Sequence, residues 1–199
     1  MDKKRIVKCV IDENGMLGLT AMGLVDVPAI EENWVALSSE KIKLASVDKE
    51  RRMLYGAALI PEKLILRIDK NNEEYYMKFE RETIERLAHD FYKKNLHHTT
   101  NLQHQYPVTG VTIVESWLKE GNSDKSLALG LTDLPDGTWF IGAKVDDDTV
   151  WEEVKSGAIR GFSIEGMFTE QTVESTVEMN FVNVESMLIK EIEQLMASL

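Results

Sequence analysis

The sequence is poor in cysteine and in long apolar runs. Cysteine occurs once, as Cys9, so the chain cannot form an internal disulfide or build a metal site from cysteine alone. Such cysteine usage fits a reducing, cytoplasmic compartment. No apolar run approaches the ~20 residues of a membrane-spanning helix, and no long apolar core follows the basic N-terminal residues, as it would in a signal peptide. We therefore expect a cytoplasmic protein with no membrane partner.

Basic charge is also scarce. The chain carries 23 Lys and Arg against 34 Asp and Glu, a formal net charge of −11. This balance repels nucleic acid and anionic membranes, so a direct nucleic-acid partner is not expected. Hydrophobic residues nevertheless make up 43% of the 199 residues. That is enough for one domain with a buried core.

The residue patterns predict mostly strands. Extended or β-branched segments cover residues 5–10, 34–37, 52–60, 65–70, 75–79, 108–118, 127–131, 139–145, 159–168 and 172–184. Helical patterns cover residues 80–94, a short stretch after Asp148 or Thr149 that ends at Gly157, and residues 185–199. The predicted fold class is α+β: a mainly antiparallel β-barrel or curled sheet with about three surrounding helices. Residues 1–184 would form the domain and 185–199 a C-terminal helical segment.

Ser163 is the first candidate for chemistry. Alternation along residues 161–166 places Phe162 and Ile164 on one face of a strand, and Ser163 and Glu165 on the other. Glycines nearby permit close backbone approach, which a site for an oxyanion needs. The spacing does not match the Gly-x-Ser-x-Gly elbow of α/β-hydrolases. From the residues alone, an ordinary strand serine remains the simpler interpretation.

His104 is the candidate base. It precedes a strand in Asn-Leu-Gln-His, and a neutral imidazole near Ser163 could take the serine proton. The other three histidines fit surface or packed positions, with a weak metal site at His97 and His98 as an alternative. The Asp146–Asp148 run lacks the pattern of a calcium loop and is interpreted as a turn and helix cap.

A third group would orient the imidazole, and three carboxylates qualify. We rank them Glu178, on the segment after the serine strand, then Glu115, on the strand after His104, then Glu165, on the face of Ser163. Each is also explained as a solvated carboxylate.

Several segments together resemble the prohead (capsid maturation) serine proteases of tailed bacteriophages, in the XkdF-like branch. The resemblance covers roughly residues 20 to 168 and is most specific from Trp139 to Gly166. The segments that carry it, in order, are Leu24 to Ala29, Pro61-Glu62, Tyr75 to Phe79, Asn101 to His104, Val114 to Trp117, Gly137 to Trp139 and Gly161 to Gly166. One departure is Gln103, where the family pattern leads us to expect an acidic residue.

The resemblance implies a fold like that of herpesvirus assemblin and an endopeptidase packaged inside the procapsid in the host cytoplasm. It implies Ser163 as nucleophile, His104 as base, and no metal or organic cofactor. Backbone N–H groups around Arg160 and Gly161 would stabilise the oxyanion. Scaffold and major capsid protein are the implied substrates, together with the protease itself, and a homodimer is an implied association state.

Two other functions stay open at this point. The first is a non-catalytic, scaffold-associated or structural virion protein on the same fold. The second is an unrelated ligand-binding β-barrel, in which Ser163 and His104 would lie far apart. The helical segment 185–199 could dock on scaffold or shell, remain from an extension removed by self-cleavage, or pack on the barrel.

Overall fold

A computed structural model describes residues 4–11, 17–26, 28–29, 35–37, 51–131 and 134–173. The predicted helix at 185–199, the predicted strand beyond residue 173 and Glu178 lie outside these residues. The strands are β1 (Ile6–Val10), β2 (Gly18–Val25), β3 (Val35–Leu37), β4 (Met53–Leu59), β5 (Ile65–Ile68), β6 (Glu74–Lys78), β7 (Thr100–Leu102), β8 (Tyr106–Val108), β9 (Val111–Leu118), β10 (Trp139–Val145), β11 (Gly161–Met167) and β12 (Thr169–Val173). The helices are α1 (Arg81–Lys93), α2 (Lys125–Ala128) and α3 (Asp148–Ser156), with 3₁₀ turns η1 (Leu96–His98) and η2 (Gly121–Ser123).

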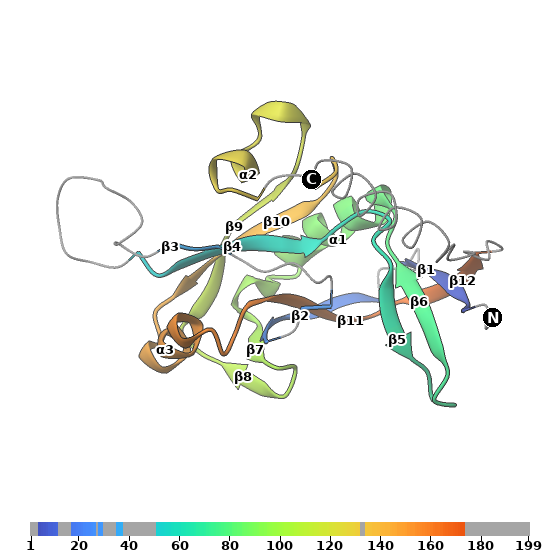
Figure 1. Ribbon diagram of the computed structural model, residues 1–199, viewed down its shortest axis with the longest axis horizontal. Helices are drawn as coiled ribbons and strands as arrows, with labels where there is room; N and C mark the ends of the chain where they lie inside the picture. The colour runs from blue at the N-terminus through green and yellow to red at the C-terminus, as the bar shows by residue number, and fades with distance from the viewer. Residues whose placement is uncertain are drawn as a thin grey trace, which may run out of the picture.

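The described strands form three four-stranded sheets. Their orders are β12-β1-β6-β5, β3-β4-β10-β9 and β11-β2-β7-β8. Most neighbours are antiparallel, but β1 pairs with β6 and β2 pairs with β7 in parallel. Figure 1 shows the β4–β10 layer above the β2–β11 layer, with the β1–β6 sheet to one side. The α+β class is confirmed.

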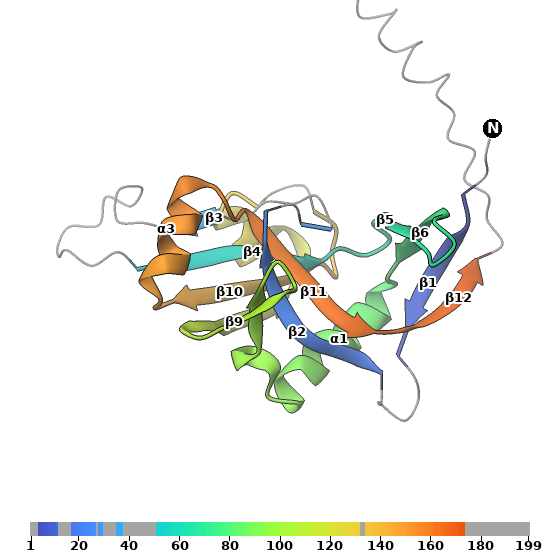
Figure 2. The same ribbon diagram turned by 90° about the horizontal axis from the view of Figure 1, so that it is seen from below.

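The predicted barrel is not seen, because the described strands form no closed barrel. Each sheet ends in strands that pair on one side only, and β11 is one of them. The sheets are joined through the chain: β11 continues into β12 after a single residue, Phe168, and so passes from one sheet to another (Figure 2). Alternation in a sequence indicates strands but does not indicate which edges pair, so it could not distinguish closure from three open sheets.

The core lies where α1 and β11 pack against the β4–β10 sheet. Helix α1 contacts β9 and β10, and β11 contacts β4. Helix α1 buries Thr83, Ile84, Leu87, Ala88 and Phe91, the apolar face that its spacing predicts. The Phe91 ring meets Trp139 of β10 edge-on, with centroids 5.6 Å apart. Strand β4 is buried along almost its whole length, as expected for a central strand covered on both faces.

Two local predictions need correction. The segment 127–131 was expected to be extended, but its first residues belong to helix α2, which Asp124 caps by accepting from the Ser126 N–H at 2.8 Å. The cap of α3 is Asp147, one residue before the expected Asp148, and it accepts from the Val150 N–H at 2.9 Å. Helix α3 ends at Gly157, which has a φ of 76°, as predicted.

Candidate active site

The described residues include a cleft of about 700 Å³ that Ser163 and His104 both line. Glu165 and Gln103 border the same cleft, and Arg67 is the cationic side chain on its wall. The remaining wall is mostly apolar, from Val25, Pro28, Ala29, Ala58, Leu59, Ile65, Leu66, Met77, Phe79, Phe162, Ile164 and Phe168. The site therefore joins a few polar groups to a large hydrophobic surface, as ligand and substrate sites commonly do.

Ser163 lies on β11, the edge strand of its sheet. Its neighbour Phe162 is 1% exposed and Ser163 is 7% exposed, and both border the cleft. Within the described part of the chain, the Ser163 hydroxyl makes no hydrogen bond, so the bond to His104 is not formed. Catalytic hydrogen bonds are often long or absent in substrate-free enzymes.

His104 lies in the turn between β7 and β8 rather than on a strand. The turn is closed by the Gln105 N–H, which donates to the Leu102 carbonyl at 2.9 Å. Gln103 and His104 have φ values of 52° and 57°. Left-handed backbone costs a non-glycine residue about 1–2 kcal/mol, and such strain is typical of functional sites. The turn presents the His104 ring over the neighbouring strand.

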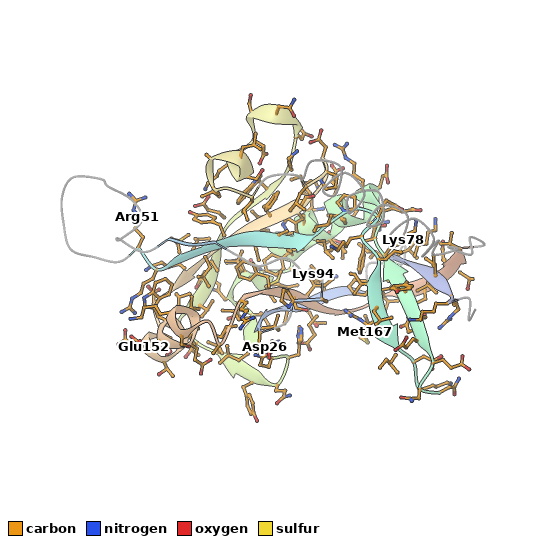
Figure 3. All side chains as sticks on the ribbon, viewed as in Figure 1. Asp26, Arg51, Lys78, Lys94, Glu152 and Met167 are labelled. Carbon is orange, nitrogen blue, oxygen red and sulfur yellow. The ribbon has the colours of Figure 1, made fainter. Side chains whose placement is uncertain are left out.

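The side chain of Gln103 stabilises the same turn. When its amide is oriented to suit both partners, the Gln103 nitrogen donates to Asp26 Oδ1 and its oxygen accepts from the Asp26 N–H, each at 3.1 Å. Asp26 directly follows β2, and Figure 3 labels it at one end of the β2–β11 pair and Met167 near the other. A carboxylate at position 103 would face the Asp26 carboxylate, which gives a physical reason for the glutamine.

Gly23 of β2 lies between the serine and histidine elements. It pairs with Ser163 of β11 on one side and with Asn101 of β7 on the other. Directly paired residues point to the same face of a sheet, with Cβ atoms about 5 Å apart. A Cβ on Gly23 would lie 2.7 Å from His104 Cε1 and 3.0 Å from His104 Nδ1. The imidazole therefore fills the side-chain space of Gly23, beside Ser163.

Glu165 is the carboxylate that reaches His104. Its Oε2 lies 3.4 Å from His104 Nδ1 and accepts a 2.7 Å hydrogen bond from Asn101 Nδ2. Asn101 Oδ1 in turn accepts from the His104 N–H at 3.1 Å. The His104 and Glu165 side chains are 34% and 45% exposed, so both are reachable from solvent.

The structure does not bring Glu115 to this cleft. Glu115 accepts from the Tyr55 hydroxyl at 2.5 Å and is bonded to Lys125, in a second pocket between α1 and β9. Burial alone would raise the pKa of Glu115, but the hydrogen bonds from Lys125 and Tyr55 outweigh it and lower that pKa. Burial, together with the bond to Glu115, raises the pKa of Tyr55 to about 12. The hydrogen bonds to Tyr55 and Lys125 therefore explain the position of Glu115 without a role in the cleft.

The backbone N–H groups of Arg160 and Gly161, expected to stabilise the oxyanion, are placed less favourably for their role than Ser163 and His104. The Arg160 N–H donates to the Val25 carbonyl at 2.8 Å, so it is directed into the sheet. Gly161 pairs with Val25 in the ladder, and neither residue borders the cleft. No group of three or more potential metal ligands occurs among the described residues.

The arrangement suits proton transfer from serine to histidine. If His104 carries its proton on Nδ1, facing Glu165, then Nε2 has a free lone pair for the Ser163 proton. The carboxylate would fix this tautomer and stabilise the imidazolium that forms. The candidate nucleophile, base and orienting group thus come from β11 and the β7–β8 turn, which β2 holds side by side.

Comparison with protein-family models matches residues 41–174, well over half of the chain, to the family described as "Putative phage serine protease XkdF". The chain belongs to this family. The match confirms the phage serine protease resemblance, although its range does not include the early segment from Leu24 to Ala29. No curated protein and no solved structure matches the chain, and the relation to herpesvirus assemblin stays a prediction.

Two site residues of this family member were given no role by sequence reasoning. Gly23 was seen only as one glycine of an apolar segment, and Asn101 only as part of the motif before His104. The signal for Asn101 was its position at the start of a turn. An asparagine side chain there commonly accepts a hydrogen bond from a backbone N–H a few residues further along the chain. Nothing in the sequence pointed to Gly23, because its partners come from distant segments. Across the described residues, no helix is long and apolar enough to span a membrane.

Proposed function

We propose that this chain is the serine endopeptidase of phage capsid maturation, which cleaves scaffold and capsid protein segments, and itself, inside the procapsid. Membership of the phage serine protease family supports the reaction class. The observation that carries the proposal is the His104 ring in the side-chain space of Gly23, directly beside Ser163 and within reach of Glu165. A ligand-binding protein has no need of this juxtaposition.

The proposed reaction begins with acylation of Ser163. His104 Nε2 takes the hydroxyl proton while Ser163 Oγ bonds to the carbonyl carbon of the scissile peptide. The tetrahedral intermediate collapses as the C–N bond breaks, and His104 returns its proton to the leaving amine. Water then attacks the acyl-enzyme with His104 again as base, which releases the new carboxyl end and restores Ser163.

The edge position of β11 supports a peptide substrate. Among the described strands β11 pairs with β2 alone, and an extended substrate chain would add to its other side as a further strand. The apolar wall of the cleft would receive side chains of that chain. Alternate N–H groups on this edge are also the natural candidates for oxyanion donors, since the Arg160 N–H is engaged by Val25.

The test is co-expression of the chain with the scaffold and major capsid protein of its own phage, analysed by gel and intact mass. Wild type should yield fragments, whereas Ser163→Ala and His104→Ala should leave every protein intact. Ser156→Ala, at an exposed serine on α3, is the matched control and should cleave like wild type. Identical products from Ser163→Ala and wild type would favour the structural virion protein instead.

A further inference from the structure

We propose that Asn101 is a positioning residue of the catalytic machinery, which holds His104 and Glu165 in register through its two amide ends. The proposal rests on the proposed function, because it assigns Asn101 a role in activating Ser163. Asn101 Nδ2 donates to Glu165 Oε2 at 2.7 Å, and Asn101 Oδ1 accepts from the His104 N–H at 3.1 Å. One side chain therefore links the base and its carboxylate.

The two partners of Asn101 explain why this position needs an amide side chain. A carboxylate can only accept and a backbone N–H can only donate, so the amide orientation is fixed by both contacts. Aspartate at this position could still accept from His104 but would repel Glu165. Alanine or leucine would provide neither contact. Among the residues of similar size, asparagine alone satisfies both partners.

The location of Asn101 separates positioning from substrate binding. The residue is 8% exposed, lies on β7 between Gly23 and Pro107, and does not border the cleft. Its contact with the His104 N–H helps to offset the strained φ of that residue. Loss of the amide would release the turn from β7 and Glu165 from His104 without removing a residue that lines the cleft.

The charges around the imidazole give a measurable consequence. Glu165 faces Nδ1, Arg67 lies on the cleft wall, and Asp26 lies behind Gln103. If Asn101→Ala frees Glu165 to move away, the imidazolium that forms loses a favourable partner and the rate of Ser163 modification should fall. Asn101→Asp keeps the acceptor for the His104 N–H but loses the donor to Glu165, so it should retain part of the rate. A residue that served only the stability of the sheet would not produce this graded loss in the folded protein.

The first measurement is the chemical shift of the His104 Cε1–H resonance by NMR at one fixed pH, assigned by its loss in His104→Ala among only four histidines. The second is the rate at which a fluorophosphonate modifies Ser163. In that reaction the Oγ–P bond forms, fluoride leaves and His104 Nε2 takes the proton. Both Asn101 variants should move the His104 resonance. Asn101→Ala should reduce the labelling rate by about tenfold or more, and Asn101→Asp should reduce it less.

Thr100→Val is the matched control. Thr100 is the adjacent buried polar residue on β7, and its hydroxyl donates to the Val108 and Val111 carbonyls instead of the site. This variant should lose stability but keep the His104 resonance position and the labelling rate of wild type. Alternation along the strand accounts for the difference, because the two side chains point to opposite faces.

The outcomes separate this proposal from the proposed function. An unmoved His104 resonance in both Asn101 variants, or equal effects of Thr100→Val and Asn101→Ala, would overturn the positioning role even if wild type is labelled. If wild type is not labelled but the His104 resonance moves in both Asn101 variants and not in Thr100→Val, the positioning of His104 stands and the protease function fails. Since Asn101→Asp is isosteric, it keeps the measurement decisive if Asn101→Ala does not fold.

Discussion

The imidazole of His104 occupies the space that a side chain on Gly23 would fill, with Cε1 2.7 Å from the position of the missing Cβ. Real Cβ atoms essentially never approach a neighbour so closely. Glycine at this position is therefore a requirement for the histidine to lie beside Ser163, which pairs directly with Gly23. A residue on β2 thus decides whether the candidate base, His104, can reach the candidate nucleophile, Ser163.

Gly23→Ala should lower the rate of Ser163 modification by about tenfold or more, because the new methyl group displaces the His104 ring from its place. The methyl would also meet Asn101 Oδ1 at 3.0 Å. The measurement is the second-order rate of fluorophosphonate labelling at pH 7.5.

Gly142→Ala provides the control for that substitution. A Cβ there would meet Tyr55 Cε1 at 2.6 Å, an equally close contact in a different sheet. It should lower the midpoint of thermal unfolding while leaving the labelling rate of the folded protein within about twofold of wild type. A labelling rate of Gly23→Ala equal to that of Gly142→Ala would contradict the placement of His104.

Glu165→Gln should reduce labelling by about 10- to 100-fold, since the amide keeps the shape but removes the charge that stabilises imidazolium. Glu115→Gln should leave the rate unchanged, because Glu115 is bonded to Tyr55 and Lys125 away from the cleft. Glu178→Gln completes the set of three candidates. The largest loss identifies the orienting carboxylate, and a larger loss in Glu178→Gln than in Glu165→Gln would rule against Glu165.

Gln103→Glu should lower the free energy of unfolding by about 1 kcal/mol or less, since it places a carboxylate against the exposed Asp26. Adding Asp26→Asn to Gln103→Glu should restore most of the lost free energy of unfolding. Residue 26 would then supply the amide and residue 103 the carboxylate. Chemical denaturation of the four proteins in the double-mutant cycle measures this coupling. Additive losses would show that residues 26 and 103 do not interact.

Asp124→Ala should lower the free energy of unfolding by about 1 kcal/mol at neutral pH. Burial by itself raises the pKa of Asp124, but hydrogen bonds from the Ser126 N–H at 2.8 Å and Trp117 Nε1 at 3.0 Å outweigh it and lower that pKa. A carboxyl with a lowered pKa in the folded state contributes stability above its unfolded pKa and loses it as pH falls through the folded value.

The difference between wild type and Asp124→Ala should therefore be constant above about pH 5 and shrink steadily toward pH 3. Urea unfolding at intervals of pH measures it. Glu85→Gln, at an exposed position on α1, serves as the reference for the substitution of a surface carboxylate. A difference that grows as the pH falls would contradict the assigned sign.

The sequence was sufficient for features that depend on neighbouring residues. Helix α1 followed from its apolar spacing, and the end of α3 followed from Gly157. Each of these is a property of one element. The order of the strands and the absence of a closed barrel among the described strands depend on edges that meet across long sequence distances.

The same distinction applies to the site. Ser163 and His104 could be singled out by motif, but Glu165 was ranked below Glu178 and Glu115 because sequence distance says little about spatial reach. Glu165 of β11 contacts His104, in the turn after β7, because β2 lies between β11 and β7. The glycine of β2 at this position, Gly23, leaves space for the histidine ring. The turn at His104 was also missed, since neither Gln103 nor His104 is a residue type that usually takes positive φ at no cost.

The most direct test of the account is intact-mass and peptide mapping after incubation with a fluorophosphonate. Wild type should gain one adduct, located on Ser163, and neither Ser163→Ala nor His104→Ala should gain it at a comparable rate. An adduct on another residue would contradict the assignment of Ser163 as a nucleophile activated by His104, and so would labelling of Ser163 at an unchanged rate in His104→Ala.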